Sequence, residues 1–168
     1  IPPMSRCLGL LQGVQWIINM VINGGQWSTV FSEPNLLMNN KLSTINRHQI
    51  AGFPLVIKST QDPMKINENI HEAYIGINAI NNLHHYIPNF AYIFGLHQEG
   101  GTYNVITEYI KGITLSEYIK SPQFKFNDFL LIVVQLCYAL HLAQQKCAFV
   151  HYDLTPWNIM IQKISGVQ

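Results

Sequence analysis

The stretch H-Y-D-L-T-P-W-N-I-M-I, residues 151–161, decides the fold assignment, because it places a carboxylate and a carboxamide five positions apart just before an apolar strand. The carboxylate of Asp153 can accept the proton of an incoming hydroxyl group. The amide oxygen of Asn158 can ligate a hard magnesium ion that nucleotide phosphates already hold. The spacing is therefore typical of a site for phosphoryl transfer.

The composition of the chain is that of one domain with an apolar core and a largely uncharged polar surface. Hydrophobic residues make up 48% of the 168 residues. Charged residues make up 11%, against roughly 25% in typical soluble domains. The net charge is +1 with histidine neutral, and lysine and arginine form no block. We therefore expect no nucleic acid among the partners.

The cysteines and the apolar segments bear on the location of the chain. Cys7, Cys137 and Cys147 lack C-x-x-C spacing, so we expect reduced thiols rather than a disulfide framework or a zinc site. Polar residues such as Gln15 and Gln135 interrupt the longest apolar segments, so we expect no membrane span. Because the first residue is not methionine, we expect an internal piece of a longer intracellular product.

The first part of the chain predicts two strands around a glycine turn. Residues 1–16 show little pattern and are interpreted as a lead-in. Residues 17–22 and 27–31 are mostly apolar and flank the N-G-G sequence that begins at Asn23, which predicts strand, turn and strand. Such a turn is a candidate phosphate cradle, and an ordinary hairpin turn is compatible with the same residues. Residues 32–52 are polar and are interpreted as an insertion.

A strand, a helix and a hairpin are predicted next. Residues 55–58, L-V-I-K, predict an apolar strand that ends in a lone lysine. Residues 67–85 carry apolar side chains every three or four positions, which predicts a helix with one face on the sheet. Residues 90–97 and 102–110 predict two strands joined by a glycine turn.

Two further helices are predicted before residue 151. Residues 115–120 predict a short helix, and Asn127 can cap a long helix over residues 128–146. Apolar residues cover most of the circumference of the long helix, so it requires burial on nearly all sides. We expect a larger helical lobe, missing from this sequence, to pack against it.

The order of these motifs resembles that of the protein kinase superfamily over residues 17–161. The opening stretch resembles the catalytic loop H-R-D-L-x-x-x-x-N, with Tyr152 in place of the arginine. Thr155 stands in place of the lysine of Ser/Thr-specific members. Residues 55–58 resemble the V-A-I-K strand, and the helix after it resembles the kinase αC helix. The sequence ends before the position of the D-F-G motif.

The resemblance implies an α+β fold of the protein kinase type. It implies a five-stranded antiparallel N-lobe sheet with the αC helix over residues 17–108, then the hinge and the first part of the helical C-lobe over residues 109–168. The implied activity is transfer of the ATP γ-phosphate to a protein hydroxyl, with Ser/Thr favoured, and the implied cofactors are ATP and magnesium. The composition resembles kinases of large DNA viruses, so the expected location is the cytoplasm, in a host cell, or a virion.

The same resemblance implies roles for individual residues. Asp153 would orient and deprotonate the acceptor, and Asn158 would bind magnesium. Lys58 would grip the phosphates, held by a helix glutamate, for which we favour Glu72 over Glu68 because Glu72 lies one turn deeper in the helix. The other implied nucleotide-binding residues come from the glycine loop, the lysine strand, the back of the adenine pocket and the hinge backbone: Asn23, Gly25, Ser28, Val30, Val56, Thr107, Glu108 and Ile110.

Two other interpretations stay open. Small-molecule phosphotransferases of the same superfamily also use H-x-D-x-x-x-x-N, although the D-L-x-P sequence of the loop favours the protein kinase branch. A catalytically impaired pseudokinase or interaction module is favoured by the single glycine kept in the glycine loop and by Tyr152. The joint retention of Lys58, Asp153 and Asn158 argues against it.

Overall fold

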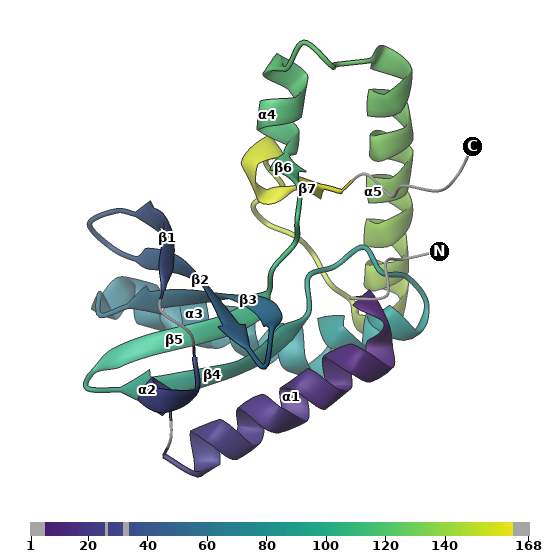
Figure 1. Cartoon of the computed structure of the whole chain (residues 1–168). Helices are drawn as coiled ribbons and strands as arrows, with labels where there is room; N and C mark the ends of the chain where they lie inside the picture. The colour runs from purple at the N-terminus through teal and green to yellow at the C-terminus, as the bar shows by residue number, and fades with distance from the viewer. Residues whose placement is uncertain (1–5, 26, 32–33, 163–168) are drawn as a thin grey trace. The chain divides into compact units, whose positions relative to one another are not determined.

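An antiparallel sheet is the centre of the first of the two units into which the chain divides, Ile1–Tyr109 and Ile110–Gln168 (Figure 1). The structure, a computed structural model, describes residues 6–25, 27–31 and 34–162. Five strands lie in the order β1-β2-β3-β5-β4, and neighbours are antiparallel. They are β1 (Asn35–Asn39), β2 (Thr44–Ile50), β3 (Phe53–Thr60), β4 (Ile93–Glu99) and β5 (Thr102–Glu108). The predicted five-stranded antiparallel sheet is confirmed.

The central strand, β3, has two different faces because successive side chains of a strand point in opposite directions. Leu55 and Ile57 are buried on one face, which we call the outer face. Val56 and Lys58 lie on the other, which we call the inner face. Since directly opposed residues share a face, Thr107 of β5, the partner of Val56, also belongs to the inner face.

Helix α3 (Pro63–Asn78) packs on the inner face of the sheet. Asp62 caps it, since its Oδ1 accepts hydrogen bonds from two backbone N–H groups of the first turn at 2.9 and 3.3 Å. The proline at the first helical position loses nothing, because its N–H would have no partner there. Ala73 of α3 forms a buried cluster with Ile93 and Val105 of the sheet.

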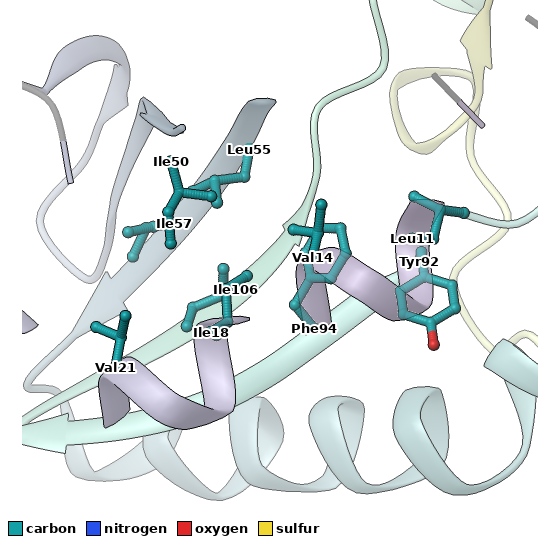
Figure 2. Close-up of a cluster of buried hydrophobic side chains, with 10 residues drawn as sticks. All are labelled: Leu11, Val14, Ile18, Val21, Ile50, Leu55, Ile57, Tyr92, Phe94 and Ile106. Carbon is teal, nitrogen blue, oxygen red and sulfur yellow. The ribbon is translucent and has the colours of Figure 1, made fainter. Parts of the chain in front are cut away.

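Helix α1 (Leu8–Asn23) packs on the outer face and forms a third layer. Its buried side chains recur every three or four residues: Leu11, Val14, Ile18 and Val21. Figure 2 shows them beside the outer-face side chains of the sheet and the residue just before β4, which are Ile50, Leu55, Ile57, Tyr92, Phe94 and Ile106. Full burial of one such aliphatic side chain contributes about 1.5–3 kcal/mol. The outer layer is thus a principal part of the core of this unit.

The strand, turn and strand predicted for residues 17–31 are wrong. Of the lead-in predicted over residues 1–16, residues 8–16 belong to a helix, and residues 1–5 lie outside the described residues. Residues 8–23 form α1, and Trp27–Val30 form the one-turn helix α2. A short apolar run does not by itself distinguish a strand from a buried helix. The helical spacing of buried positions starts at Leu11, outside the run that the strand prediction used.

The insertion predicted over residues 32–52 is wrong for its described part, residues 34–52, which supplies the first two strands of the sheet, and residues 32–33 lie outside the described residues. Strands β1 and β2 pair there as a hairpin. Their sequences, N-L-L-M-N and T-I-N-R-H-Q-I, are rich in asparagine and other polar residues, which strands disfavour. Strand β1 is exposed along its whole length at the edge of the sheet, so no buried face imposes an alternating pattern on it.

The other predicted elements are present with shifted ends. The helix predicted over residues 67–85 is α3 followed by the 3-10 helix η2 (Ile80–His85). The strands predicted over residues 90–97 and 102–110 are β4 and β5. Asn127 is not a cap but lies within the long helix, whose N-cap residue is Lys125.

The second unit combines two helices with a two-stranded sheet. Its elements are β6 (Ile113–Thr114), α4 (Leu115–Lys120), α5 (Phe126–Cys147), η3 (Pro156–Asn158) and β7 (Met160–Ile161). Helix α4 begins with a capping box, in which Thr114 Oγ1 accepts from Glu117 N at 3.1 Å and Glu117 Oε2 accepts from Thr114 N at 2.7 Å. Strands β6 and β7 pair antiparallel, so the residues just before α4 are joined to the residues just after η3.

Replacing Ile18 with alanine should destabilise the first unit far more than the same change at the neighbouring Ile17. Ile18 is fully buried against the sheet, whereas Ile17 is 37% exposed. We expect Ile18→Ala to lower the free energy of unfolding by about 2–5 kcal/mol and Ile17→Ala by less than about 1 kcal/mol, as measured by chemical denaturation. Equal losses for the two variants would show that α1 does not pack as described.

Candidate active site

Lys58 on the inner face forms an ion pair with Glu72 of α3. The Nζ atom of Lys58 lies 2.9 Å from Oε2 of Glu72. The pair results from the alternation of β3, which directs Lys58 to the inner face, and from the packing of α3 on that face. The two side chains are 33% and 47% exposed, so the pair contributes at most about 1 kcal/mol to stability. The lysine side chain is therefore not closed off from solvent.

Glu68, the other carboxylate of α3, has a different partner. Its Oε2 lies 2.6 Å from Nζ of Lys65, one turn earlier on the same helix. The structure therefore brings Glu72, and not Glu68, to Lys58. The part that this ion pair takes in binding a nucleotide stays a prediction.

Val56 and Thr107 lie opposite one another on the inner face. They are cross-strand partners in the ladder between β3 and β5, and Lys58 is two residues further along β3. Both side chains are partly exposed. The structure thus places the residue predicted for the back of the adenine pocket beside the residue predicted to contact the nucleotide from β3.

The predicted glycine loop does not lie near the lysine. Asn23 is the last residue of α1, Gly25 has φ +69° in the following turn, and Ser28 and Val30 lie in α2. Val30 packs against the core of the outer face, whereas Lys58 lies on the inner face. The prediction of a phosphate cradle at these four residues is wrong, because it depended on a strand where the chain forms a helix.

The hairpin between β1 and β2 lies beside the lysine instead. Ile45 of β2 is the cross-strand partner of Lys58. The turn, N-K-L-S at residues 40–43, contains no glycine, and Asn40 Oδ1 accepts hydrogen bonds from the backbone N–H groups of Leu42 and Ser43 at 2.9 and 2.7 Å. These amide groups are therefore already satisfied by a side chain, unlike those that a glycine-rich loop offers to phosphates.

The end of β5 holds the residue predicted to contact adenine through its backbone. The backbone N–H of Glu108 donates to Tyr92 O at 2.8 Å. Its buried carboxylate accepts hydrogen bonds from Arg6 and from the backbone N–H of Tyr92. The next predicted hinge residue, Ile110, is the first residue of the second unit.

In the second unit, Asp153 and Asn158 are joined directly. Asn158 Nδ2 donates to Oδ2 and to the backbone carbonyl of Asp153, at 2.9 Å in both cases. The loop is further closed by the Thr155 N–H, which donates to the same carbonyl at 3.0 Å. Both candidate side chains are exposed. The bonds use the nitrogen of the Asn158 amide, so its oxygen is not engaged by them.

Backbone hydrogen bonds between the end of this loop and the segment before α4 anchor the loop. Leu115 N donates to Ile159 O at 2.8 Å, and β7 pairs with β6 directly after the loop. A Cβ atom on Gly112 would lie 2.1 Å from Ile161 O. The backbone therefore approaches this closely only because residue 112 is glycine.

The donor atoms of this loop fit a magnesium ion. Magnesium prefers carboxylate and amide oxygens together with substrate phosphates and water, and Asp153 and Asn158 offer such oxygens from one exposed loop. Among residues 6–25, 27–31 and 34–162, no group of three or more His, Cys, Asp or Glu side chains forms a cluster that could hold a metal without phosphates. The site therefore fits a metal that arrives with a nucleotide.

Comparison with solved structures identifies the fold. A mutant form of the Mycobacterium tuberculosis PknI kinase domain matches with a TM-score of 0.60 over 79% of this chain and 54% of that chain. The sequence identity is 18%, so this likeness shows the fold alone. The kinase-like fold predicted from the sequence is confirmed.

The sequence identifies the family. The model of the family described as "Protein tyrosine and serine/threonine kinase" matches residues 22–168. The chain therefore belongs to the protein kinase family. The match begins at Ile22, so Arg6 and most of α1 lie outside it.

Two viral proteins are similar to this chain in sequence. Uncharacterized protein 179R of Invertebrate iridescent virus 6 is 38% identical over 141 residues, which cover 76% of this chain and 12% of that protein. Probable kinase 098L of Invertebrate iridescent virus 3 is 30% identical over 109 residues, which cover 65% of this chain and 21% of that protein. The chain thus spans a small part of the length of these relatives.

Replacing Gly76 with alanine should weaken the packing of α3 on the sheet and lower stability, whereas the same change at Gly13 should not lower stability. A Cβ atom on Gly76 would lie 2.1 Å from Cδ1 and 2.8 Å from Cγ1 of the buried Ile93. We expect Gly76→Ala to lower the free energy of unfolding by about 1–3 kcal/mol, as overpacking does. Gly13 lies in α1 with nothing within 4 Å, so Gly13→Ala should raise stability by about 0.5–1 kcal/mol. Denaturation of both variants checks this, and a stabilising Gly76→Ala would contradict the packing.

Proposed function

We propose that this chain is the N-lobe and the start of the C-lobe of an ATP-dependent protein kinase that phosphorylates Ser or Thr side chains. The observation that carries the proposal is the ion pair between Lys58 Nζ and Glu72 Oε2, 2.9 Å apart on the inner face. Such a pair holds an ammonium group over the α- and β-phosphates of the nucleotide. The alternative is a solvated lysine at the end of a surface strand, and that alternative does not require a carboxylate from a second element such as α3.

The adenine ring of the nucleotide packs on Val56 and Thr107 in this proposal. These partly exposed side chains lie beside Lys58 on the same face of the sheet. A nucleotide bound there can place its base on Val56 and Thr107 and its phosphates at Lys58. The backbone carbonyl of Glu108 and the backbone groups of Ile110 supply hydrogen bonds to the adenine edge, since the N–H of Glu108 already donates to Tyr92 O. Their side chains do not take part, so residue identity there carries little information.

The carboxylate of Asp153 accepts the proton of the acceptor hydroxyl as its oxygen attacks the γ-phosphorus. The bond between the γ-phosphorus and the bridging oxygen breaks, and ADP leaves with the bond's electron pair. Asn158 orients the Asp153 carboxylate through its amide nitrogen and offers its amide oxygen to magnesium. When bound, the metal neutralises the negative charge of the phosphate oxygens. Thr155 replaces the lysine of Ser/Thr kinases, so acceptor choice depends on residues outside this loop.

The apolar surface of helix α5 suits packing against further helices, as in the C-lobe of a protein kinase. Leu131 and Val134 of this helix are 61% and 64% exposed in the chain as it stands. By length and composition, α5 is the one helix in the described part of the chain that could cross a membrane. The core helix of a kinase lobe has the same composition, and family membership favours this explanation.

A nucleotide-binding protein without transfer activity is the second candidate. The turn between β1 and β2 favours it, because Asn40 Oδ1 occupies the N–H groups of Leu42 and Ser43. Tyr152, which replaces the arginine of the catalytic loop, is 95% exposed. This candidate binds ATP as the kinase does and differs in releasing it unchanged.

Replacing Asp153 with asparagine in the full-length protein should abolish phosphotransfer and leave ATP binding intact. The amide oxygen of asparagine can still accept from Asn158 Nδ2, so the loop keeps its hydrogen bond while losing the proton acceptor. We expect the transfer rate to fall by about 100- to 10,000-fold, measured as radioactive phosphate incorporated into a generic protein acceptor.

The matched control is Glu99→Gln, which makes the same carboxylate-to-amide change at an exposed residue of β4. It should leave the rate unchanged. Undiminished transfer by Asp153→Asn would show that Asp153 is not the base. Binding of ATP without transfer by the unmodified protein would favour the second candidate.

A further inference from the structure

A buried ion pair links the segment before α1 to the end of strand β5. Arg6 Nε lies 2.6 Å from Glu108 Oε1, and Arg6 Nη2 donates to Glu108 Oε2 at 3.2 Å. The same Nη2 donates to Phe90 O at 2.8 Å. The side chains of Arg6 and Glu108 are 13% and 2% exposed. This ion pair is more deeply buried than the pairs Lys58–Glu72 and Lys65–Glu68.

The buried carboxylate of Glu108 depends on this arginine. A charged group out of contact with water must be paired and hydrogen-bonded. Besides the arginine, the donor to Glu108 is the backbone N–H of Tyr92, which donates to Oε2 at 3.1 Å. Without Arg6, the nearly fully buried carboxylate would keep, among the described residues, the neutral hydrogen bond from the N–H of Tyr92.

Helix α1 carries the arginine to this position. The helix starts two residues after Arg6, and its apolar side packs on the outer face. Gln15 of α1 adds a second polar contact, because Tyr92 Oη donates to its Oε1 at 2.6 Å. The ring of His84 packs edge-on against Tyr92 at 5.3 Å. Burial, and secondarily Arg6, lower the pKa of His84 to about 4, so the imidazole is neutral beside the arginine.

We propose that Arg6 is a positioning residue for nucleotide binding, which acts through Glu108 from the outer face of the sheet. The proposal rests on the proposed function, in which the backbone of Glu108 meets the adenine edge. Side chains alternate along β5, so Thr107 contacts the inner face while Glu108 is held from the outer face. The backbone at Glu108, which carries the carbonyl proposed to meet adenine, is therefore held from both faces of the sheet. Helix α1 and the arginine before it, mostly outside the family match, thus support the nucleotide site without contacting the nucleotide.

Two ligands separate positioning from general stability. ATP contains the adenine ring, whereas inorganic tripolyphosphate contains the phosphates alone. On the full chain, Arg6→Ala should weaken ATP binding about tenfold, the loss of roughly one hydrogen bond, and leave tripolyphosphate binding unchanged. Lys65→Ala is the matched control, since it removes an exposed ion pair with the same 2.6 Å separation. It should change the affinity for neither ligand.

A double variant keeps the test decisive if Arg6→Ala does not fold. Arg6→Met with Glu108→Gln removes both charges together and so leaves no buried carboxylate unpaired. It should fold and still bind ATP more weakly than the unmodified chain, with tripolyphosphate unaffected.

Three results would overturn the proposal. Unchanged ATP affinity in the folded variants would show that Arg6 positions nothing, while leaving the proposed function intact. An equal loss for ATP and tripolyphosphate would show a general structural role. An unmodified chain that binds neither ligand would overturn the proposed function together with this inference.

Discussion

The register of strand β3 is the constraint on which the rest of the first unit depends. Its apolar residues Leu55 and Ile57 complete the core beneath α1, and its residues Val56 and Lys58 face α3 and the candidate nucleotide site. A shift by one residue would exchange the two faces. The lysine would then enter the apolar outer core, and an isoleucine would replace it beside Glu72. The burial of apolar side chains therefore also determines where the ammonium group lies.

Stability and the candidate chemistry reside in different residues. The buried side chains of α1 and the sheet contribute the larger share of the folding free energy. The ion pair between Lys58 and Glu72 is partly exposed, and Asp153 and Asn158 lie on an exposed loop. These polar groups can contact a ligand because folding does not bury them. Glu108 is the exception, since its side chain is buried in an ion pair while its backbone is proposed to contact adenine.

The sequence predicted what short patterns determine and failed where tertiary packing decides. The lysine strand, the helix with Glu72 and the loop with Asp153 and Asn158 carry local signals, and the structure contains each of them. The first two strands were misplaced because β1 is an exposed edge without alternation and because the apolar run at residues 17–22 belongs to a helix. The link between Arg6 and Glu108 joins residues 102 positions apart. No local pattern reports a contact of that kind.

The measurement that tests the central claim most directly is covalent labelling with an acyl phosphate derivative of ATP, which transfers its acyl group to a lysine amine beside bound phosphates. Peptide mass spectrometry then identifies the lysine that is modified. If the inner face binds the nucleotide, Lys58 is acylated, and excess ATP suppresses this label while sparing any label on the exposed Lys65. Labelling of Lys58 that excess ATP does not reduce, or no labelling of Lys58 at all, would contradict the account.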